Sequence, residues 1–243
     1  MKRYIRSAIV PATDEDWKVQ CEIAMNPRTR ADVLDAIARQ NYDAITVLQI
    51  VVYNPNTSVD TLNRLAGNSI VYIRELVARR QDLPSSTLDK LADDPAEDVR
   101  CRVAENPNTS LRTLGKLAKD PEFSVRKRVA ENPKASSSIL IRLTKSDFDL
   151  GFNALSNPNC PHEVPELLAN NRIPRIREDL ARDPNTPADI LAKLANDDEY
   201  YVRLGVATNE STPSEVLRQF TELDDYVLSM NAKATLQRKG ESV

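Results

Sequence analysis

Apolar residues recur along this chain in short clusters, and nearly the same cluster returns about every 26 residues. In residues 99–106, VRCRVAEN, the apolar side chains Val99, Val103 and Ala104 are spaced so that they share one face of a helix. Residues 125–132, VRKRVAEN, repeat the pattern. An Asn–Pro pair closes both segments. It predicts the end of the helix, because Asn tolerates the left-handed backbone conformation and Pro cannot continue a helix.

A second apolar cluster follows each of the first ones. It consists of two leucines and an alanine that also share one helical face. Four copies are Leu62/Leu65/Ala66, Leu88/Leu91/Ala92, Leu114/Leu117/Ala118 and Leu191/Leu194/Ala195. The alternation of the two clusters predicts a pair of short helices in each repeat.

Threonines three residues past the recurring Asn are expected to provide the N-caps of the second helices. The candidates are Thr29, Thr57, Thr109, Thr186 and Thr212. Pro187 and Pro213 would then stand at the first helical position, where a missing N–H costs nothing. Acidic residues three positions after a threonine predict capping boxes at Asp32, Asp60, Asp189 and Glu215.

The recurring Asn, or the residue in its place, marks eight repeats. These positions are Asn26, Asn54, Arg80, Asn106, Asn132, Asn157, Asp183 and Asn209. Helices this short are marginal alone in water, and each has an apolar stripe that only a neighbour can cover. The sequence therefore predicts an all-α fold, an α-solenoid superhelix of about eight 26-residue two-helix repeats, similar to HEAT arrays.

We expect one solenoid domain over 1–243. In it, 1–13 form an N-terminal segment and 14–220 the repeats. Residues 221–239 are expected to form a C-terminal capping helix, and 240–243 a frayed tail.

The repeats resemble those of the leucine-rich repeat variant family, LRV. The resemblance rests on the pattern VRxxVAxNPxTPxxxLxxLA, which stands in residues 120–144 and 197–220, and it covers roughly residues 14–220. It implies alternating helices of α and 3₁₀ type in a right-handed superhelix without β-sheet. Some family members bind an iron–sulfur cluster through a cysteine-rich N-terminal segment. Residues 1–20 contain no cysteine, so this cluster is not expected here.

Composition narrows the classes of function. The net charge of −3 gives no overall field that would attract nucleic acid or an anionic membrane. Three scattered cysteines argue against a disulfide framework and for a reducing compartment. We find neither an apolar run of signal-peptide length at the start nor a stretch of the ~20 apolar residues that span a membrane. We therefore expect a cytoplasmic protein without a cofactor or a metal site.

Two columns of polar residues recur with the repeats. One is the Arg that follows Val, at Arg74, Arg100, Arg126, Arg177 and Arg203; the other is the recurring Asn, at Asn54, Asn106, Asn132, Asn157 and Asn209. The arginines could bind phosphates or carboxylates of a partner. A structural ladder is the favoured interpretation, with each Arg bonding a helix end or an acidic residue such as Asp94, Asp120 or Asp197. The asparagines are expected to satisfy backbone groups in their own turn and in the neighbouring repeat.

A basic column on the second helices is the best candidate for a partner surface. It contains Arg64, Lys90, Lys116, Arg142 and Lys193, and Arg102, Lys127 and Arg128 on the first helices extend it. Stacked helices lie ~8–10 Å apart, so this would be a long stripe able to contact a polyanion. The favoured interpretation is an ordinary solvated face, with helix-surface pairs such as Asp60–Arg64 and Asp189–Lys193, and contact with an acidic protein partner is a further alternative.

Two segments break the pattern. In 147–172, Gly151 replaces the Arg, Cys160 replaces the capping Thr, and Pro165 is expected to delay or kink the second helix. This segment predicts either a local bend or a binding notch, whereas Cys160 and His162 lack the further groups that catalysis or a metal needs. Residues 45–54, ITVLQIVVYN, are either a fully buried helix or an apolar patch that faces a partner.

The sequence favours a non-enzymatic module that binds a protein partner through its extended repeat surface. The residues after the recurring Arg vary in charge and size, and Phe152 occupies one of these positions. Such variety indicates an irregular partner. Nucleic-acid binding, by analogy with HEAT-like DNA glycosylases, is the alternative. An enzyme with its site on the concave face is a third hypothesis.

Overall fold

The computed structural model describes residues 16–41 and 44–242, and within these ranges it contains seventeen α-helices and no strand. The first helices of the eight repeats are α2 (Asp16–Met25), α4 (Ile45–Tyr53), α6 (Val71–Ala78), α8 (Glu97–Glu105), α10 (Phe123–Glu131), α12 (Phe148–Leu155), α14 (Pro174–Arg182) and α16 (Tyr200–Thr208). The second helices are α3 (Ala31–Gln40), α5 (Val59–Leu65), α7 (Ser85–Leu91), α9 (Leu111–Leu117), α11 (Ser137–Ser146), α13 (Glu163–Ala169), α15 (Ala188–Leu194) and α17 (Ser214–Thr221). A last helix, α18 (Tyr226–Arg238), follows. The predicted all-α architecture of eight two-helix repeats is confirmed.

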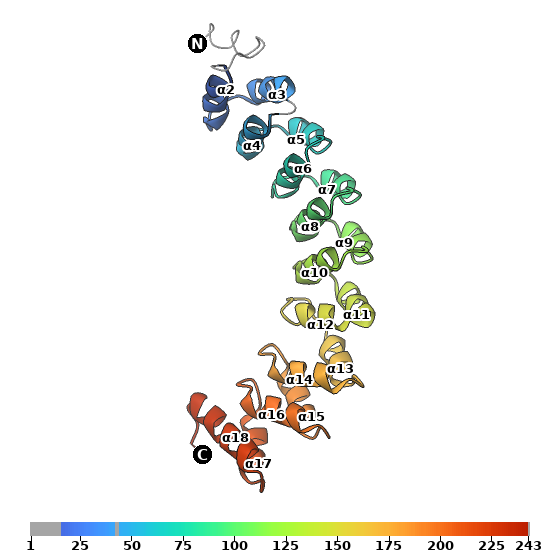
Figure 1. Cartoon of the computed structure of the whole chain (residues 1–243), viewed down its shortest axis with the longest axis vertical. Coiled ribbons are helices and arrows are strands. Elements are labelled where there is room, and N and C mark those ends of the chain that lie inside the picture. Colours follow the sequence, from blue (N-terminus) through green and yellow to red (C-terminus); the bar gives the residue numbers. More distant parts are fainter. Residues whose placement is uncertain (1–15, 42–43, 243) are drawn as a thin grey trace. The chain divides into compact units, whose positions relative to one another are not determined.

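The chain divides into two compact units, residues 1–132 and 133–243, where the sequence predicts one domain over 1–243. The predicted N-terminal segment 1–13 lies outside the described residues. In the first unit, the first helices α2, α4, α6, α8 and α10 stack directly on one another along one edge (Figure 1). The second helices line the other edge and pack on adjacent first helices. In the second unit, α14, α16 and α18 form a similar stack.

The core lies between the two helix rows of each unit. Val99, Val103 and Ala104 of α8 are fully buried, as are the leucines that face them from the second helices. Burying a leucine or valine side chain contributes roughly 1.5–3 kcal/mol relative to leaving it in water. Leu48, which stands in α4 where other repeats have Arg, is also fully buried. The repeated apolar stripes are therefore what holds the short helices in a stack.

The recurring asparagines join each repeat to the one before it. The side-chain amide of Asn106 donates to the carbonyls of Ala78 and Arg80, both at 2.8 Å. Asn54, Asn132 and Asn209 make the same pair of bonds at 2.6–3.2 Å. The predicted left-handed conformation is wrong: Asn106 has φ −68° and ψ 127°. This extended backbone aims the amide at the preceding repeat.

Two repeats replace this asparagine, with opposite consequences. Arg80 donates through its guanidinium Nη1 to the carbonyls of Val52 and Asn54, at 2.5 and 2.9 Å, and so makes the same link. Asp183 accepts a bond from the backbone N–H of Asn185, but an ionised carboxylate has no proton to donate to a carbonyl. The link between the sixth and seventh repeats thus lacks its side-chain amide.

The threonines do not act as N-caps. Each hydroxyl instead donates to the carbonyl six residues earlier, at 2.5–2.7 Å, and closes the end of the preceding first helix. The second helices begin one residue later than predicted, with Ser58 and Ser110 as N-caps of α5 and α9. Pro187 and Pro213 are likewise N-cap residues, one position before the predicted place.

The second helices are α-helical, so the α and 3₁₀ alternation implied by the resemblance is wrong for the described residues. In α9, the backbone N–H of Leu114 donates to Ser110, and that of Ala118 to Leu114, which are i→i+4 bonds. Bonds of the i→i+3 type occur at helix ends, as from Lys119 to Lys116. Buried leucines on one and a half turns keep these helices in α geometry.

The recurring arginines form a ladder along the turns. Nε and Nη2 of Arg100 donate to the two carboxylate oxygens of Asp120 at 2.7 and 3.0 Å, and its Nη1 donates to the carbonyls of Asp94 and Pro95. Arg74 donates in the same way to the Asp94 carboxylate and to the carbonyl of Asn68. The same pattern pairs Arg177 with Asp197, while Arg126 and Arg203 each donate to two carbonyls of the turn before their helix.

Ionisation of these buried carboxylates is favoured by their partners. Burial by itself would raise the pKa of Asp94, but hydrogen bonds from Arg74 and from the Ala96 N–H lower the pKa below its ordinary value. For Asp197, the hydrogen bond from Arg177 is the main cause of a lowered pKa. The ladder is therefore charged at neutral pH and fixes each turn to the next.

The repeat at 147–172 has a local steric reason for its irregularity. A Cβ on Gly151 would come within 2.8 Å of the Thr144 methyl group and 3.2 Å of Leu168. Glycine thus allows α12 to pack closely on α11 and α13. The helix α13 begins six residues past Asn157 rather than the usual five, which confirms the predicted delay. Pro165 lies in its first turn, where backbone N–H groups have no partner in the helix.

The C-terminal end is more ordered than predicted. The helix α18 begins at Tyr226 instead of 221, because α17 continues to Thr221. Gly240, with φ 77°, ends α18, and the N–H of Glu241 donates to the carbonyl of Leu236 in a Schellman motif. The Glu241 carboxylate also pairs with Arg218 at 2.7 Å. The predicted frayed tail 240–243 is therefore wrong for Gly240 and Glu241.

Within residues 16–41 and 44–242, no helix has the length and apolarity needed to cross a membrane. Nor do three or more His, Cys, Asp or Glu side chains gather there as metal ligands would.

We expect Asn106→Ala to lower the free energy of unfolding by about 1–3 kcal/mol, since two buried carbonyls lose their donor. Urea unfolding followed by circular dichroism measures this change. Asn26→Ala is the matched control: Asn26 holds the same position in the first repeat and is exposed, and among the described residues its side chain accepts only from the N–H of Arg28. Equal losses in the two variants would contradict the role of the amide as a link.

Asp183→Asn should stabilise the protein, by about 0.5–1.5 kcal/mol, because the new amide can donate to the carbonyls of Leu155 and Asn157. The same urea experiment tests it. An unchanged or lower midpoint would mean that the seventh repeat does not need this link.

Candidate binding surfaces

The predicted basic column is largely neutralised by the repeats themselves. Arg64 donates to the Asp35 carboxylate of the preceding repeat at 2.6 Å, and its side chain is only 27% exposed. Lys116 pairs with Asp93 and Lys193 with the Asn170 side-chain oxygen, both again in the preceding repeat. The predicted i,i+4 pairs Asp60–Arg64 and Asp189–Lys193 are not the ones formed, because these long side chains reach across to the neighbouring repeat.

The other members of the column are exposed. Arg142 lies on the outer face of α11. Lys90, at the end of α7, makes no ion pair with any described residue. The column is therefore a series of cross-repeat pairs with single exposed cations, rather than a continuous basic stripe.

The basic residues of the first helices are also paired. A chain of alternating charges crosses α6, α8 and α10, with N–O distances of 2.9–3.0 Å, in the order Glu75, Arg102, Glu105, Arg128 and Glu131. Lys127 lies 3.9 Å from Glu131. This face is charged but balanced, so it offers a polyanion little net attraction.

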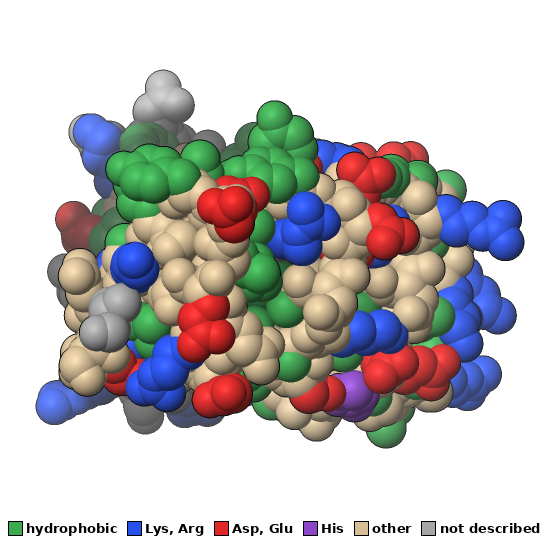
Figure 2. All heavy atoms as spheres, turned by 90° about the horizontal axis from the view of Figure 1, so that it is seen from below, with side chains coloured by type: hydrophobic (Ala, Val, Ile, Leu, Met, Phe, Trp, Pro, Cys, Tyr) green, Lys and Arg blue, Asp and Glu red, His purple; other side chains and the backbone are tan. Residues whose placement is uncertain are grey.

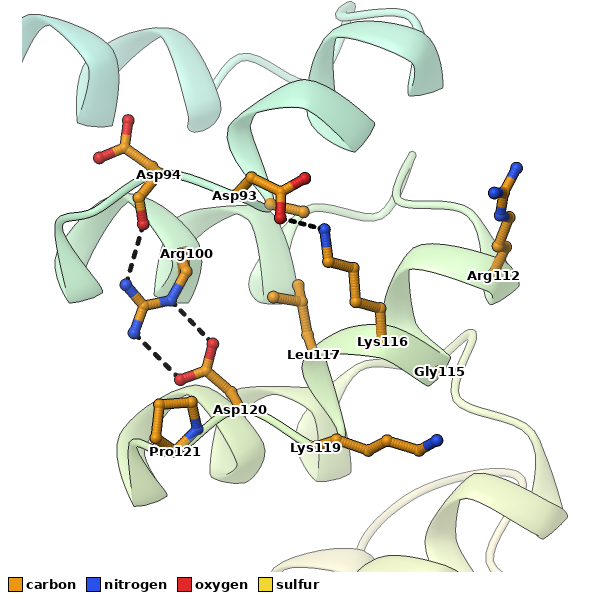
Figure 3. A pocket seen from close by; sticks show the side chains of 11 residues that line it. Asp93, Asp94, Arg100, Arg112, Gly115, Lys116, Leu117, Lys119, Asp120 and Pro121 are labelled. Atoms are coloured by element: carbon orange, nitrogen blue, oxygen red, sulfur yellow. Dashed lines mark hydrogen bonds and ion pairs between the residues drawn. The ribbon is translucent and has the colours of Figure 1, made fainter.

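A groove lies beside α9, between the turn that follows α7 and the turn that follows α9. We call it the α7–α9 groove; it has a volume of about 780 Å³ and is lined by Ala92, Asp93, Asp94, Arg100, Arg112, Gly115, Lys116, Leu117, Lys119, Asp120 and Pro121. Figure 3 shows the Arg100–Asp120 and Lys116–Asp93 pairs along it, with Arg112 and Lys119 turned away from these pairs. A smaller hollow of about 380 Å³ lies at the equivalent place between α13 and α15.

Apolar side chains are exposed at the ends of α2 and α4. Met25 at the end of α2 and Tyr53 at the end of α4 are 63% and 55% exposed, and with Ile50 they line a hollow of about 250 Å³. We call Met25, Ile50 and Tyr53 the α2–α4 patch. Residues 45–54 are therefore not a fully buried helix, since Leu48 and Val51 are buried but Tyr53 is exposed. Phe152 in α12, also a candidate, is half-buried.

The irregular repeat has a hollow of its own, about 280 Å³, lined in part by Cys160, His162 and Pro165. His162 is the only histidine, and its two ring nitrogens face carboxylates, Asp189 at 2.6 Å and Glu166 at 3.8 Å (Figure 2). Burial raises the pKa of the Cys160 thiol to about 11. The histidine is therefore turned to carboxylates, and the thiol stays protonated at neutral pH.

Arg112, Gly115 and Lys119 of the α7–α9 groove are not among the binding residues that the sequence predicts. They were readable in principle, because residues 111–119 contain three cations, no carboxylate and a glycine inside a helical pattern. The α2–α4 patch also left a signal, since Met25 and Tyr53 both directly precede the recurring Asn, where the next three repeats have Arg79, Glu105 and Glu131.

Comparison of the fold with solved structures gives one informative match. A protein described as a leucine-rich repeat variant with a novel repetitive structural motif superposes with a TM-score of 0.57. It is 23% identical, and the match covers 84% of this chain and 85% of that one. This chain has an LRV-like fold. The resemblance seen in the repeat pattern is thereby confirmed at the level of the fold.

More distant matches are to engineered and designed proteins. An engineered protein matches with a TM-score of 0.32 at 14% identity, over 99% of this chain and 78% of its own. A designed armadillo repeat protein in complex with the peptide (KR)4 matches with a TM-score of 0.22 at 13% identity, over 97% of both chains. No protein-family model and no curated protein matches the chain.

A pH dependence follows from the cross-repeat pairing in this LRV-like stack. Burial raises the pKa of Asp35, but hydrogen bonds from Arg39, Thr61 and Arg64 outweigh it and lower the pKa to about 2. Because the pKa is lower in the folded state, the carboxylate stabilises the fold above about pH 5 and loses this contribution as the pH falls toward 2. After solvent screening we expect about 1 kcal/mol.

The test compares the urea midpoints of the wild type and Asp35→Asn across this pH range. The difference should be largest near neutrality and vanish near pH 2. Asp32→Asn is the control, since that exposed carboxylate pairs only with Arg30 among side chains. A difference that does not change with pH would contradict the assignment.

Proposed function

We propose that this chain is a non-enzymatic module that binds a protein partner through the α2–α4 patch. The observation that carries the proposal is the exposure of Met25 and Tyr53, 63% and 55%, on adjacent stacked helices beside a hollow. Methionine and tyrosine are enriched at protein interfaces, and a few such residues in a central pocket carry most of the binding energy.

The chemistry of the rest of the first-helix row supports the same choice. Charged residues in α6, α8 and α10 pair with one another, as Arg102 does with Glu75 and Glu105, so they can border an interface without needing a charged partner. Apolar side chains at the row's N-terminal end and balanced charges further along resemble the apolar core and polar rim of an interface. A rigid stack also loses little conformational freedom when it binds.

Nucleic-acid binding receives less support. Of the basic residues that would contact phosphates, Arg64, Arg102 and Arg128 already pair with carboxylates. A phosphate would have to displace those carboxylates, and the net charge of −3 adds no general attraction.

The proposal is tested by photo-crosslinking the full-length protein in native lysate. A photoreactive phenylalanine derivative replaces Tyr53 in one variant and Tyr201, which is 61% exposed in α16, in the control. We expect a discrete protein adduct from position 53 and none from position 201. Equal adducts at both positions, or none at position 53, would overturn the assignment of the patch.

Substitution of the patch gives an independent measure. Met25→Ser with Tyr53→Ser should reduce capture of the crosslinked partner about tenfold or more, because truncating central apolar contacts costs about 2 kcal/mol each. Tyr201→Ser should leave capture unchanged. Circular dichroism establishes that the variants are equally helical.

A further inference from the structure

We propose that the α7–α9 groove is a second, separate docking site, which binds an acidic segment of a protein partner through Arg112 and Lys119. It lies on the second helices, whereas the α2–α4 patch lies on the first helices. The inference therefore does not depend on the function proposed for that patch.

Some charged side chains of the groove are paired within the protein, whereas two cations are exposed and unpaired among the described residues. Asp94 and Asp120 are held by Arg74 and Arg100 through two hydrogen bonds each, so these buried carboxylates are neutralised in place. Arg112 and Lys119 are exposed and make no hydrogen bond or ion pair with side chains in the described part of the chain. The groove consequently presents two available cations above a neutral floor.

Lys116 lies between these two cations and contributes to the same field. It pairs with Asp93, but both side chains are at least half exposed, so the pair is loosely held. A carboxylate from a ligand can share or replace Asp93 at little cost. Three cations of one helical segment, α9 and its following turn, thus line the groove, with Arg112 and Lys119 pointing away from the Arg100–Asp120 and Lys116–Asp93 pairs (Figure 3).

Gly115 is the second, independent feature. It lies in the middle of α9, where glycine weakens a helix relative to alanine. Crowding does not explain it, because a Cβ there would meet no atom within 4 Å. Stability alone would favour a larger residue.

The three second helices before α9 use this register for a link between repeats. Asp35, Asn63 and Asp89 hold the corresponding positions, and their side chains accept bonds from Thr61, Thr87 and Thr113 of the next repeat. Gly115 has no such side chain, and the next repeat has Ile139 in place of the threonine, so this part of the α7–α9 groove stays open. A ligand backbone can therefore approach α9 closely between the cations.

The remaining lining favours a peptide over nucleic acid. No aromatic side chain lines the groove, so bases would have no surface on which to stack. The groove offers two available cations, Arg112 and Lys119, which spaced carboxylates can meet, whereas a continuous row of phosphates would find few partners there. Leu111, next to Arg112 and 57% exposed, offers an apolar contact to a side chain between two acidic residues.

The test is fluorescence anisotropy at low ionic strength with the full chain and a short fluorescein-labelled peptide that has glutamates at alternate positions. The comparison probes are the same peptide with glutamines and a single-stranded oligothymidine. We expect the glutamate peptide to bind, the glutamine peptide not to bind, and affinity to fall as salt is added. No binding of the glutamate peptide, or tighter binding of the oligothymidine, would overturn the proposal.

Charge variants locate the site. Arg112→Gln with Lys119→Gln should weaken peptide binding about tenfold or more, because two charge-assisted hydrogen bonds are lost. Arg28→Gln with Lys90→Gln removes the same charge from the same unit outside the groove and should change the affinity less than about twofold. Equal weakening by the two pairs would mean that only overall charge matters, and would overturn the assignment.

Substitution of Gly115 separates binding from folding. Gly115→Met should raise the melting temperature, because methionine favours a helix more than glycine does, and should weaken peptide binding about tenfold by filling the floor. Gly115→Ala should also raise the melting temperature but keep the affinity within about twofold. If Gly115→Met folds and still binds like the wild type, the groove is not the site.

Discussion

Each first helix of the stack ends between two repeats, where its last carbonyl groups lie away from water. A buried carbonyl without a donor is costly, and eight repeats create this problem again and again. The recurring Asn solves it across the boundary, as Asn106 does for Ala78 and Arg80. The Thr three residues later solves it within the repeat, as Thr109 does for Val103. The hydrogen bonds at the helix ends thereby link each repeat to the one before it.

This constraint explains which substitutions the repeats accept. Arg80 replaces Asn because a guanidinium can also donate twice to carbonyls on the preceding repeat. In the last repeat boundary, Thr235 of α18 donates to the carbonyl of Ala207 at 2.8 Å, which closes the final repeat. What recurs is the donor at this place, and the residue type can differ.

The sequence was sufficient for the features that depend on local spacing. The 26-residue period, the buried faces of helices such as α8, and the meeting of Arg100 with Asp120 all follow from positions along one or two repeats. It was not sufficient for features that depend on how repeats stack. The sequence predicts Thr109 as an N-cap, but its hydroxyl donates to the carbonyl of Val103. Arg64 pairs with Asp35 of the preceding repeat and not with Asp60, which is nearer in sequence.

The candidate binding surfaces were predicted least well, for a related reason. The basic column was read from charge alone, and charge on one helix does not reveal a carboxylate on the next. Once the cross-repeat pairs are assigned, Arg64 and Lys116 belong to the scaffold, while Arg112 and Lys119 are left with exposed charge.

The same reasoning, which sets aside the residues that the scaffold needs, applies to apolar and small residues. Leu48 belongs to the core, but Met25 and Tyr53 support no contact that the stack needs. Gly151 is explained by the approach of α12 to α11, whereas a Cβ on Gly115 would meet no atom within 4 Å. In a protein built from repeats, each repeat shows what folding requires at a given position. A residue that departs from this requirement without a compensating contact is therefore the most direct indication of binding that such a chain provides.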